Sequence, residues 1–210
     1  MKLREDSPQS GDIILAPHWR VRCHSFGVSA GATDREPCTI QVEAGPGFGN
    51  GSHETTQLCL LALGHLLRVG PPEPRVLDFG AGSGILSVAA AKLGALVEAV
   101  EIDAAAREHA RRVAELNGVS ARVAIRGSLA EPAERFDLVV ANILRSVLVD
   151  FAEALAVRTS PKGSLVLSGL VATDVPHILA RYSGLFVRRT AQVYERGVWR
   201  AVLYPPEAAG

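Results

Sequence analysis

Three glycines at alternate positions follow a short apolar run and stand directly before a stretch with helical spacing. The segment is Val76–Gly84, in which Gly80, Gly82 and Gly84 come after the expected strand Arg75–Phe79. Backbone without side chains lets a ligand lie against the N-terminus of the following helix, where N–H groups point outward. Tight turns between a strand and a helix also use glycine for packing, so the pattern needs support from other residues.

Two acidic residues flank this glycine turn at informative distances. Asp78 stands two residues before Gly80, and Glu101 ends the next expected strand, 17 residues after Gly84. A carboxylate at the end of that strand can accept hydrogen bonds from both hydroxyls of a ribose. Asp103, two residues further on, is interpreted as the N-cap of the next helix.

The spacing of the glycines separates two candidate cofactors. The dinucleotide pattern GxGxxG places its third glycine one position later than Gly84 stands here. A pyrophosphate would be repelled by Asp78, whereas the cationic amino-acid part of S-adenosylmethionine would be attracted. The turn therefore favours S-adenosylmethionine, and a dinucleotide such as NAD remains the alternative.

Asn142 directly follows the expected strand Phe136–Ala141. Ligands of open α/β sheets bind beyond the carboxyl ends of the strands. At such an end, the amide oxygen could accept a hydrogen bond from an amine that is to be methylated, and we predict Asn142 as the catalytic residue. Asn is also common in turns and caps, and that reading would be preferred if no glycine turn were present.

Residues 44–51 contain four glycines and precede an expected helix. One hypothesis is a lid, in which Phe48 covers the cofactor while Thr55 or Thr56 forms a hydrogen bond to it. The alternative is a flexible connector, because glycine permits many backbone conformations. His53 could act as a base, but no carboxylate partner stands near it in the sequence.

The elements that must position these residues alternate between strands and helices from Arg75 onwards, which predicts an α/β fold with a parallel, doubly wound sheet. A closing hairpin around Gly197 would add an antiparallel strand. Ser52 is expected to cap the first helix, and Pro161–Gly163 to form a turn. The expected strands are Asp12–Arg22 with an interruption at Pro17, Cys38–Glu43, Arg75–Phe79, Leu96–Ile102, Ala121–Arg126, Phe136–Ala141, Ser164–Ser168, Leu185–Val193 and Val198–Tyr204. The expected helices are Glu54–Arg68, Ile85–Leu93, Ala104–Leu116, Ser146–Arg158 and Val175–Ser183.

Length and composition bound the organisation of the chain and its partners. We expect an N-terminal β arm over residues 1–44, a main domain over 45–205 and a tail over 206–210. With 22 basic and 22 acidic residues the formal net charge is zero, so no nucleic-acid partner is expected. The three cysteines lack metal-ligand spacing, so no metal is expected. No secretory signal or membrane-spanning apolar run is found, so the expected location is the cytoplasm, without a membrane partner.

Three stretches together resemble one bacterial family, the ribosomal protein L11 methyltransferases, which modify amino groups of that protein. They are residues 47–60 (GFGNGSHETTQLCL), 76–94 with the run Gly-Ser-Gly-Ile-Leu-Ser, and 137–144 (DLVVANIL), with Leu167-Ser168-Gly169 further on. The resemblance covers about residues 38–204. It implies a Rossmann-like class I methyltransferase sheet with S-adenosylmethionine as the methyl donor.

The resemblance also implies roles for particular residues. The positions that match contacts to S-adenosylmethionine in this family are Thr56, Gly80, Glu101 and Asn142. Asn142 further matches the residue beside the transferred methyl group, and Phe48 and Gly49 match the family's loop over the cofactor. Together with Asp78, Gly82 and Gly84 from the glycine turn, these residues make up the predicted cofactor site.

Several positions depart from the family pattern. Asn50 stands where Thr is usual, Glu101 where Asp is usual, and Arg145 where a small residue is usual, which puts a cation near the mouth of the site. The family carries a separate N-terminal domain that binds the ribosomal protein, whereas 44 residues precede Gly45 here. We therefore expect an N-methyltransferase acting on an amino group, of a protein in the first place. The alternatives are a small-molecule amine as acceptor, or an NAD-dependent oxidoreductase.

Overall fold

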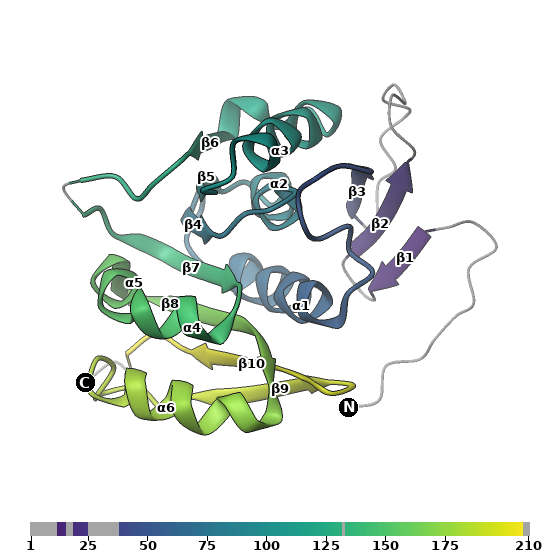
Figure 1. The fold of residues 1–210 in the computed structure, drawn as a ribbon. Helices are drawn as coiled ribbons and strands as arrows, with labels where there is room; N and C mark the ends of the chain where they lie inside the picture. Colours follow the sequence, from purple (N-terminus) through teal and green to yellow (C-terminus); the bar gives the residue numbers. More distant parts are fainter. Residues whose placement is uncertain (1–11, 16–18, 25–37, 132, 208–210) are drawn as a thin grey trace.

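The computed structural model describes residues 12–15, 19–24, 38–131 and 133–207, and within them seven strands form the main sheet (Figure 1). These strands are β4 (Arg75–Phe79), β5 (Leu96–Val100), β6 (Val123–Arg126), β7 (Phe136–Asn142), β8 (Thr159–Val171), β9 (Gln192–Arg196) and β10 (Trp199–Tyr204). Their order across the sheet is β6-β5-β4-β7-β8-β10-β9. Neighbours from β6 to β8 are parallel, and β10 runs antiparallel to β8 and β9. The expected Rossmann-like sheet with an antiparallel strand from the C-terminal hairpin is confirmed.

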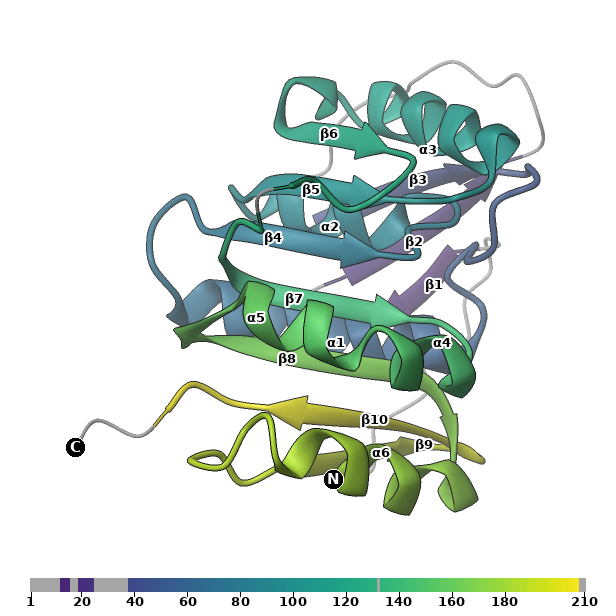
Figure 2. The same ribbon diagram turned by 60° about the vertical axis from the view of Figure 1, so that its left-hand side comes forward.

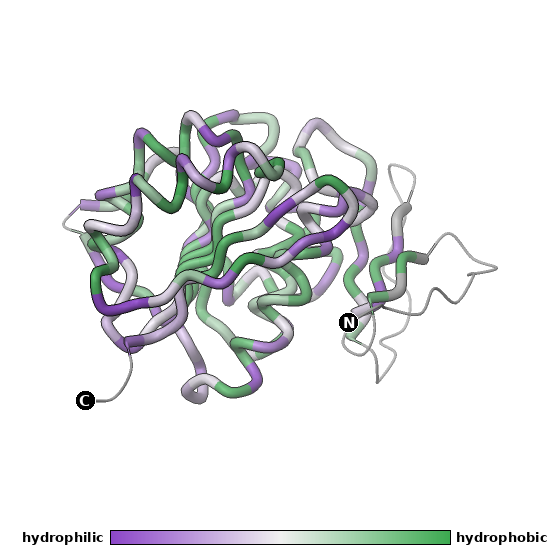
Figure 3. The backbone as a smooth tube through the Cα atoms, turned by 90° about the horizontal axis from the view of Figure 1, so that it is seen from below, coloured by the Kyte–Doolittle hydropathy of each residue, from purple (hydrophilic) through white to green (hydrophobic). Residues whose placement is uncertain are grey.

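Helices cover both faces of this sheet (Figures 1 and 2). One layer consists of α1 (Glu54–Val69), α2 (Ile85–Lys92) and α3 (Ala104–Leu116), and the other of α4 (Arg145–Asp150), α5 (Ala152–Arg158) and α6 (Val175–Ser183). Alternate residues of β4 face the two layers, because Val76 packs in the core with α1–α3 and Leu77 in the core with α4–α6. Strands buried on both faces are apolar along their length, as the centre of the sheet is in Figure 3. Within the described part of the chain, no helix is long and apolar enough to cross a membrane.

The N-terminal residues form a second, smaller sheet beside α1, α2 and α3 (Figure 1). It consists of β1 (Asp12–Leu15), β2 (Trp19–His24) and β3 (Cys38–Glu43), with β1 antiparallel and β3 parallel to β2. The strand expected over residues 12–22 is thus two strands, and Pro17 lies outside the described residues. The domain boundary expected after residue 44 stays a prediction.

This small sheet shares a hydrophobic core with the main domain. Trp19, Val21, Ile40 and Val42 are buried in the same cluster as the apolar side chains of α1 and α2. The indole N–H of Trp19 also donates a hydrogen bond to the carbonyl oxygen of Leu60 in α1, at 2.7 Å. Buried aromatic side chains dominate the energetics of such contacts, so Trp19 is expected to be the main anchor of the small sheet.

Replacing Trp19 by alanine is therefore expected to lower the free energy of unfolding by about 3–5 kcal/mol, because the side chain is fully buried and leaves a cavity. At roughly 2–4 °C for each kcal/mol, the melting temperature should fall by about 6–20 °C in calorimetry. Trp19→Phe keeps most of the apolar volume and should cost much less. An unchanged melting temperature for Trp19→Ala would mean that the small sheet adds nothing to stability.

The prediction of a turn at Pro161–Gly163 is wrong, because β8 continues through these residues. The register against β7 shifts between the pair Phe136–Thr159 and the pair Leu138–Ser164. Between these pairs, one residue of β7 is opposite four residues of β8, so the extra residues bulge out of the strand without ending it. The proline and glycine that predicted a turn are accommodated in this bulge.

Two other elements differ from the sequence expectation. The helix expected over residues 146–158 is interrupted at Phe151, where α4 ends and α5 begins, and the ring of Phe151 lies 4.9 Å from that of Phe79 between centroids. The final hairpin is shorter than expected, because its first strand begins at Gln192 and not at Leu185. Neither proline nor glycine stands at the break at Phe151, so the sequence predicted one continuous helix across it.

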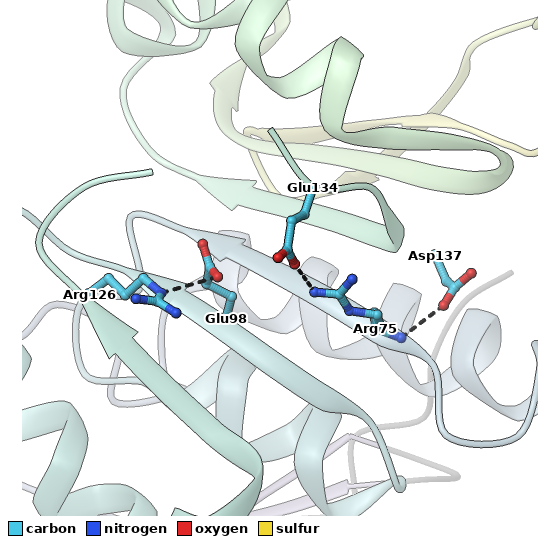
Figure 4. Close-up of polar contacts among 5 residues, drawn as sticks. All are labelled: Arg75, Glu98, Arg126, Glu134 and Asp137. Carbon is cyan, nitrogen blue, oxygen red and sulfur yellow. Dashed lines mark hydrogen bonds and ion pairs between the residues drawn. The ribbon is translucent and has the colours of Figure 1, made fainter. Parts of the chain in front are cut away.

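Ion pairs occupy part of the sheet face that is opposite α2 and α3 (Figure 4). Arg75 at the start of β4 pairs with Glu134, and Arg126 at the end of β6 pairs with Glu98 in β5 at 3.2 Å. The described residues between β6 and β7 contain no helix, so no crossover helix covers this face. Charged side chains can stay partly solvated there, and each exposed pair contributes at most about 1 kcal/mol.

Candidate active site

The glycine turn joins the carboxyl end of β4 to α2, and all three of its predicted glycines have positive φ angles. These are 81° for Gly80, 54° for Gly82 and 78° for Gly84. The backbone N–H groups of Gly80 and Ala81 donate to the carbonyl oxygen of Val100, at 2.8 and 3.0 Å, which ties the turn to the end of β5. A side chain at Gly80 would collide with Ile143. Glycine is therefore required here both for the backbone conformation and for space.

Glu101 points at this turn, as the sequence predicted. Its carboxylate accepts hydrogen bonds from the backbone N–H of Gly82 at 2.9 Å and from that of Asp103 at 3.0 Å. Arg107 holds the adjoining backbone, because its guanidinium donates to the carbonyl oxygen of Glu101 at 2.9 Å. Each carboxylate oxygen keeps further lone pairs, so the group can still accept hydrogen bonds from ligand hydroxyls. Asp103 is the N-cap of α3, as expected, and accepts from the N–H of Ala106 at 2.7 Å.

Asp78 lies fully buried beneath the turn. One carboxylate oxygen accepts from the Ser87 hydroxyl at 2.6 Å, and the other has no hydrogen-bond partner among the described residues. Burial, opposed by the Ser87 hydrogen bond, raises the pKa of Asp78 from 3.8 to about 6. An unpartnered buried oxygen carries a large desolvation penalty, which a nearby cation would reduce. Direct contact of Asp78 with a ligand stays a prediction.

Asn142 and Thr56 are brought together, although 86 positions separate them. Asn142 is the last residue of β7 and pairs with Ser168 in β8, and its amide nitrogen donates to the hydroxyl of Thr56 in the first turn of α1, at 3.4 Å. The next residue, Ile143, covers Gly80. Of the two threonines considered, Thr56 is therefore the one at Asn142, whereas the hydroxyl of Thr55 lies 2.8 Å from His53 Nδ1.

The Gly45–Gly51 loop lies directly on the glycine turn. The backbone N–H of Ser83 donates to the carbonyl oxygen of Phe48 at 2.8 Å, and the Ser83 hydroxyl donates to that of Gly49. A Cβ at Gly47 would lie 2.6 Å from the backbone nitrogen of Ser83, so the two backbones are in contact. The loop is held in place by the turn that it covers.

The Phe48 ring faces away from this contact. It is 60% exposed, and its centroid lies 5.5 Å from the ring of His53, which in turn lies 4.8 Å from Trp199 of β10. The predicted role of Phe48 as a cover for the cofactor is therefore not visible in this arrangement, and it stays a prediction.

The expected N-cap of α1 is corrected. The N-cap of α1 is His53 and not Ser52, because the N–H of Thr55 donates to His53 Nδ1, while the Ser52 hydroxyl donates to Asn50 at 2.6 Å. Arg145 was expected to place a cation near the mouth of the site. Its guanidinium pairs with Asp174 at 3.0 Å, ahead of α6.

Sequence reasoning missed several side chains that support the site. Ser83 holds the loop, Ser87 bonds to Asp78, and the amide of Gln57 donates to the carbonyl oxygens of Gly51 and Ser52, at 3.2 and 3.0 Å. Both serines belong to the Gly-Ser-Gly-Ile-Leu-Ser run, which could have indicated them. Gln57 carries no comparable sequence signal. Among the described residues, no group of three or more His, Cys, Asp and Glu side chains is placed to hold a metal.

The strand order and the glycine turn define a class I methyltransferase fold, and solved structures share it. The ribosomal protein L11 methylase from Lactobacillus delbrueckii subsp. bulgaricus has a TM-score of 0.79 and 28% identity, and the match covers 94% of this chain and 99% of that chain. The T. thermophilus 16S rRNA methyltransferase RsmC, solved with AdoMet and guanosine, has a TM-score of 0.61 at 24% identity, covering 76% and 45%. The latter likeness is one of fold alone.

This chain belongs to the Ribosomal protein L11 methyltransferase (PrmA) family, whose sequence profile matches residues 10–204. A relative of that name from Thiobacillus denitrificans is 46% identical over 181 residues, which are 86% of this chain and 56% of the relative. The chain spans about half the length of the curated relatives it matches. The methyltransferases of this family use S-adenosylmethionine. The resemblance inferred from the three sequence stretches is confirmed.

Proposed function

We propose that this chain binds S-adenosylmethionine at the glycine turn and transfers its methyl group to an amino group. One observation carries the proposal. The Glu101 carboxylate accepts a hydrogen bond from the backbone N–H of Gly82 in the turn, at the edge of the sheet where Asn142 and Thr56 also meet. A carboxylate, bare backbone and an amide at the carboxyl ends of neighbouring strands are suited to a nucleoside cofactor and an amine.

The residues present fit such a cofactor. The Glu101 carboxylate would hold the ribose hydroxyls, and Gly80 and Gly82 would let the ligand lie close to the backbone. Ile102, which follows Glu101 and is 87% exposed, would offer an apolar surface to the base. The buried Asp78, with its unpartnered oxygen, favours a ligand that carries positive charge. A dinucleotide with its pyrophosphate would meet this carboxylate unfavourably, which argues against the NAD alternative.

S-adenosylmethionine supplies a methyl group that is already activated by its sulfonium, so the protein needs mainly to position the reactants. Asn142 would accept a hydrogen bond from the acceptor nitrogen and direct its lone pair at the methyl carbon. S-adenosylmethionine would supply the methyl carbon, the electron pair of the broken C–S bond would stay on sulfur, and the acceptor nitrogen would lose a proton after forming the C–N bond. Such positioning can supply about 7–11 kcal/mol of the barrier.

The acceptor is proposed to be an amino group of a protein. The names of the relatives, which specify ribosomal protein L11, support this choice. A small-molecule amine is the second candidate acceptor. Neither acceptor requires nucleic acid or a membrane, and the cytoplasm stays the expected location.

The proposal is tested by incubating the protein with radiolabelled S-adenosylmethionine and, in separate reactions, purified L11, a panel of small amines and a lysate of the source organism. Label in L11 or in one protein band is the expected result. Label only in the small-molecule fraction would favour the second acceptor class. Tight NAD binding without binding of S-adenosylmethionine, measured by calorimetry, would overturn the proposal.

The affinity for S-adenosylmethionine is expected to fall as the pH drops below about 6. In the ligand-free protein, the pKa of the buried Asp78 is about 6. A bound cation would stabilise the ionised carboxylate and lower this pKa. On the acid side, binding must then release a proton, so the affinity should fall by up to about tenfold for each pH unit. Calorimetric titrations between about pH 5 and 8 measure this dependence.

The control is Asp78→Asn, which cannot titrate and should bind with nearly constant affinity over the same range. Without ligand, the raised pKa means that the folded protein holds this proton more tightly than the unfolded chain does. The contribution of Asp78 to stability therefore falls as the pH rises from 3.8 to about 6, and the difference between wild type and Asp78→Asn should show it. Equal pH slopes of affinity in the two proteins would contradict this role for Asp78.

A further inference from the structure

His109 of α3 is buried, and both of its ring nitrogens form hydrogen bonds with the backbone at the start of the Gly45–Gly51 loop. It is 1% exposed. Nδ1 lies 3.1 Å from the backbone nitrogen of Gly47, and Nε2 lies 3.0 Å from the carbonyl oxygen of Glu43. A backbone N–H can only donate and a carbonyl oxygen can only accept. The ring is therefore neutral, with its proton on Nε2 and an acceptor lone pair on Nδ1.

The loop is shaped to receive this ring. A Cβ at Gly45 would lie 2.5 Å from Nε2 of His109, so only glycine leaves room for the imidazole. The neighbouring residue, Ala110, packs against Gly84, where an added Cβ would lie 3.0 Å from the Ala110 side chain. Two consecutive residues of α3 thus contact the loop and the glycine turn, and fix the distance between them.

A pocket of about 380 Å³ borders the loop, and its lining includes Glu43, Gly45, Phe48, Ser83 and His109. A glycine-rich segment beside such a space can adopt several positions unless hydrogen bonds select one. Ser83 bonds to the loop at Phe48 and Gly49, and His109 bonds to it at Gly47. The His109 side chain thus acts on Gly47, and Ser83 acts on the next two residues through its backbone N–H and its hydroxyl.

We infer that His109 is a positioning residue, which holds the Gly45–Gly51 loop against the glycine turn and so sets the affinity for the cofactor. This inference rests on the proposed function, because it assumes that the turn binds S-adenosylmethionine. The hydrogen bond to Gly47, and not the bulk of the ring, carries the effect. An acceptor at the place of Nδ1 should therefore preserve it.

Two conservative variants separate the ring's two contacts. His109→Asn keeps an oxygen at about the position of Nδ1 and can still accept from Gly47. His109→Gln places its amide nitrogen at about the position of Nε2 and can still donate to Glu43. His109→Ala removes both contacts. Arg112→Ala is the matched control, because the Arg112 side chain comes from the same helix and pairs with the Glu43 carboxylate at 2.7 Å.

Hydrogen exchange of the residue 44–52 peptide in the ligand-free protein reports on the contact itself. Loss of the hydrogen bond should speed exchange at Gly47 and weaken S-adenosylmethionine binding by about tenfold in His109→Ala and His109→Gln. His109→Asn and Arg112→Ala should stay close to wild type. Melting temperatures show whether each variant is folded, and if His109→Ala is not, the Asn and Gln variants decide the matter.

Exchange at Gly47 that does not change in His109→Gln would overturn the inference, as would faster exchange with unaltered affinity. Equal loss of affinity in the Asn and Gln variants would assign the effect to the ring's bulk, against the inference. Failure of the proposed function looks different. The wild-type protein would then bind no S-adenosylmethionine, while the exchange pattern among the variants would still report on the loop.

Discussion

Replacing Glu101 by alanine is expected to weaken S-adenosylmethionine binding by roughly 1000-fold, because two hydrogen bonds to a charged group are lost together. In the structure this carboxylate is held beside the turn by the N–H groups of Gly82 and Asp103. It is thus already oriented before a ligand arrives. The substitution also leaves the N–H of Gly82 without its acceptor, which should loosen the turn further. Titration calorimetry of wild type and variant measures the change.

Two further variants make this result specific. Glu101→Asp keeps a carboxylate, and Asp is usual here in the family, so the affinity should stay within about tenfold of wild type. Glu98→Ala removes a carboxylate from the same strand, but Glu98 pairs with Arg126 and not with the turn. It should leave the affinity unchanged. Binding by Glu101→Ala at near wild-type affinity would show that the ribose is held elsewhere, and the proposed site would then be wrong.

The part of the site that sequence could predict is the part encoded in short, contiguous motifs. The glycine turn, Glu101 and Asn142 each follow a strand, and the carboxyl ends of parallel strands meet at one edge of a sheet. In the parallel sheet that the sequence predicted, residues at these ends are expected on the same side of the sheet. The structure has this arrangement, with β5 and β7 on either side of β4. Local patterning and topology were sufficient for these residues.

The rest depended on contacts between segments far apart in the chain. His109 lies 62 positions from Gly47, and its helical spacing alone marks it as one more residue of α3. Gln57 lies only six positions from Gly51, but its amide reaches the loop because α1 begins beside it. Side chains that can form hydrogen bonds occur everywhere on helices, so their role depends on what the fold brings to them.

Each wrong prediction about the fold has an identifiable cause. Proline and glycine at residues 161–163 predicted a turn, but parallel pairing with β7 continued on both sides and left a bulge. At Phe151 the helix is interrupted without a proline or glycine, and the Phe151 ring packs against Phe79 at this point. His53 displaced Ser52 as the N-cap because its ring nitrogen reaches the N–H of Thr55. In each case a tertiary contact or an unusual side chain prevailed over propensity.

Asn142→Ala is expected to reduce methyl transfer by roughly 100- to 1000-fold while leaving most of the affinity for S-adenosylmethionine, because the lost contact would orient the acceptor nitrogen in the transition state. The amide nitrogen of Asn142 is engaged by the Thr56 hydroxyl at 3.4 Å, which directs the amide oxygen elsewhere. Thr56 therefore fixes which end of the amide is presented. Transfer rates under saturating labelled cofactor, compared with calorimetric affinities, separate the two effects.

Thr56 provides the test of that orientation. Thr56→Val removes the hydroxyl with little change in volume and should lower the transfer rate in the same direction as Asn142→Ala, though less. Thr56→Ser keeps the hydroxyl and should transfer at close to the wild-type rate. Because Asn142 and Thr56 would act through one hydrogen bond, the double variant Asn142→Ala with Thr56→Val should be scarcely slower than Asn142→Ala alone. Fully additive losses would exclude the Thr56 hydrogen bond as the means of orienting the amide. A normal rate in Asn142→Ala would exclude the amide from the transfer step.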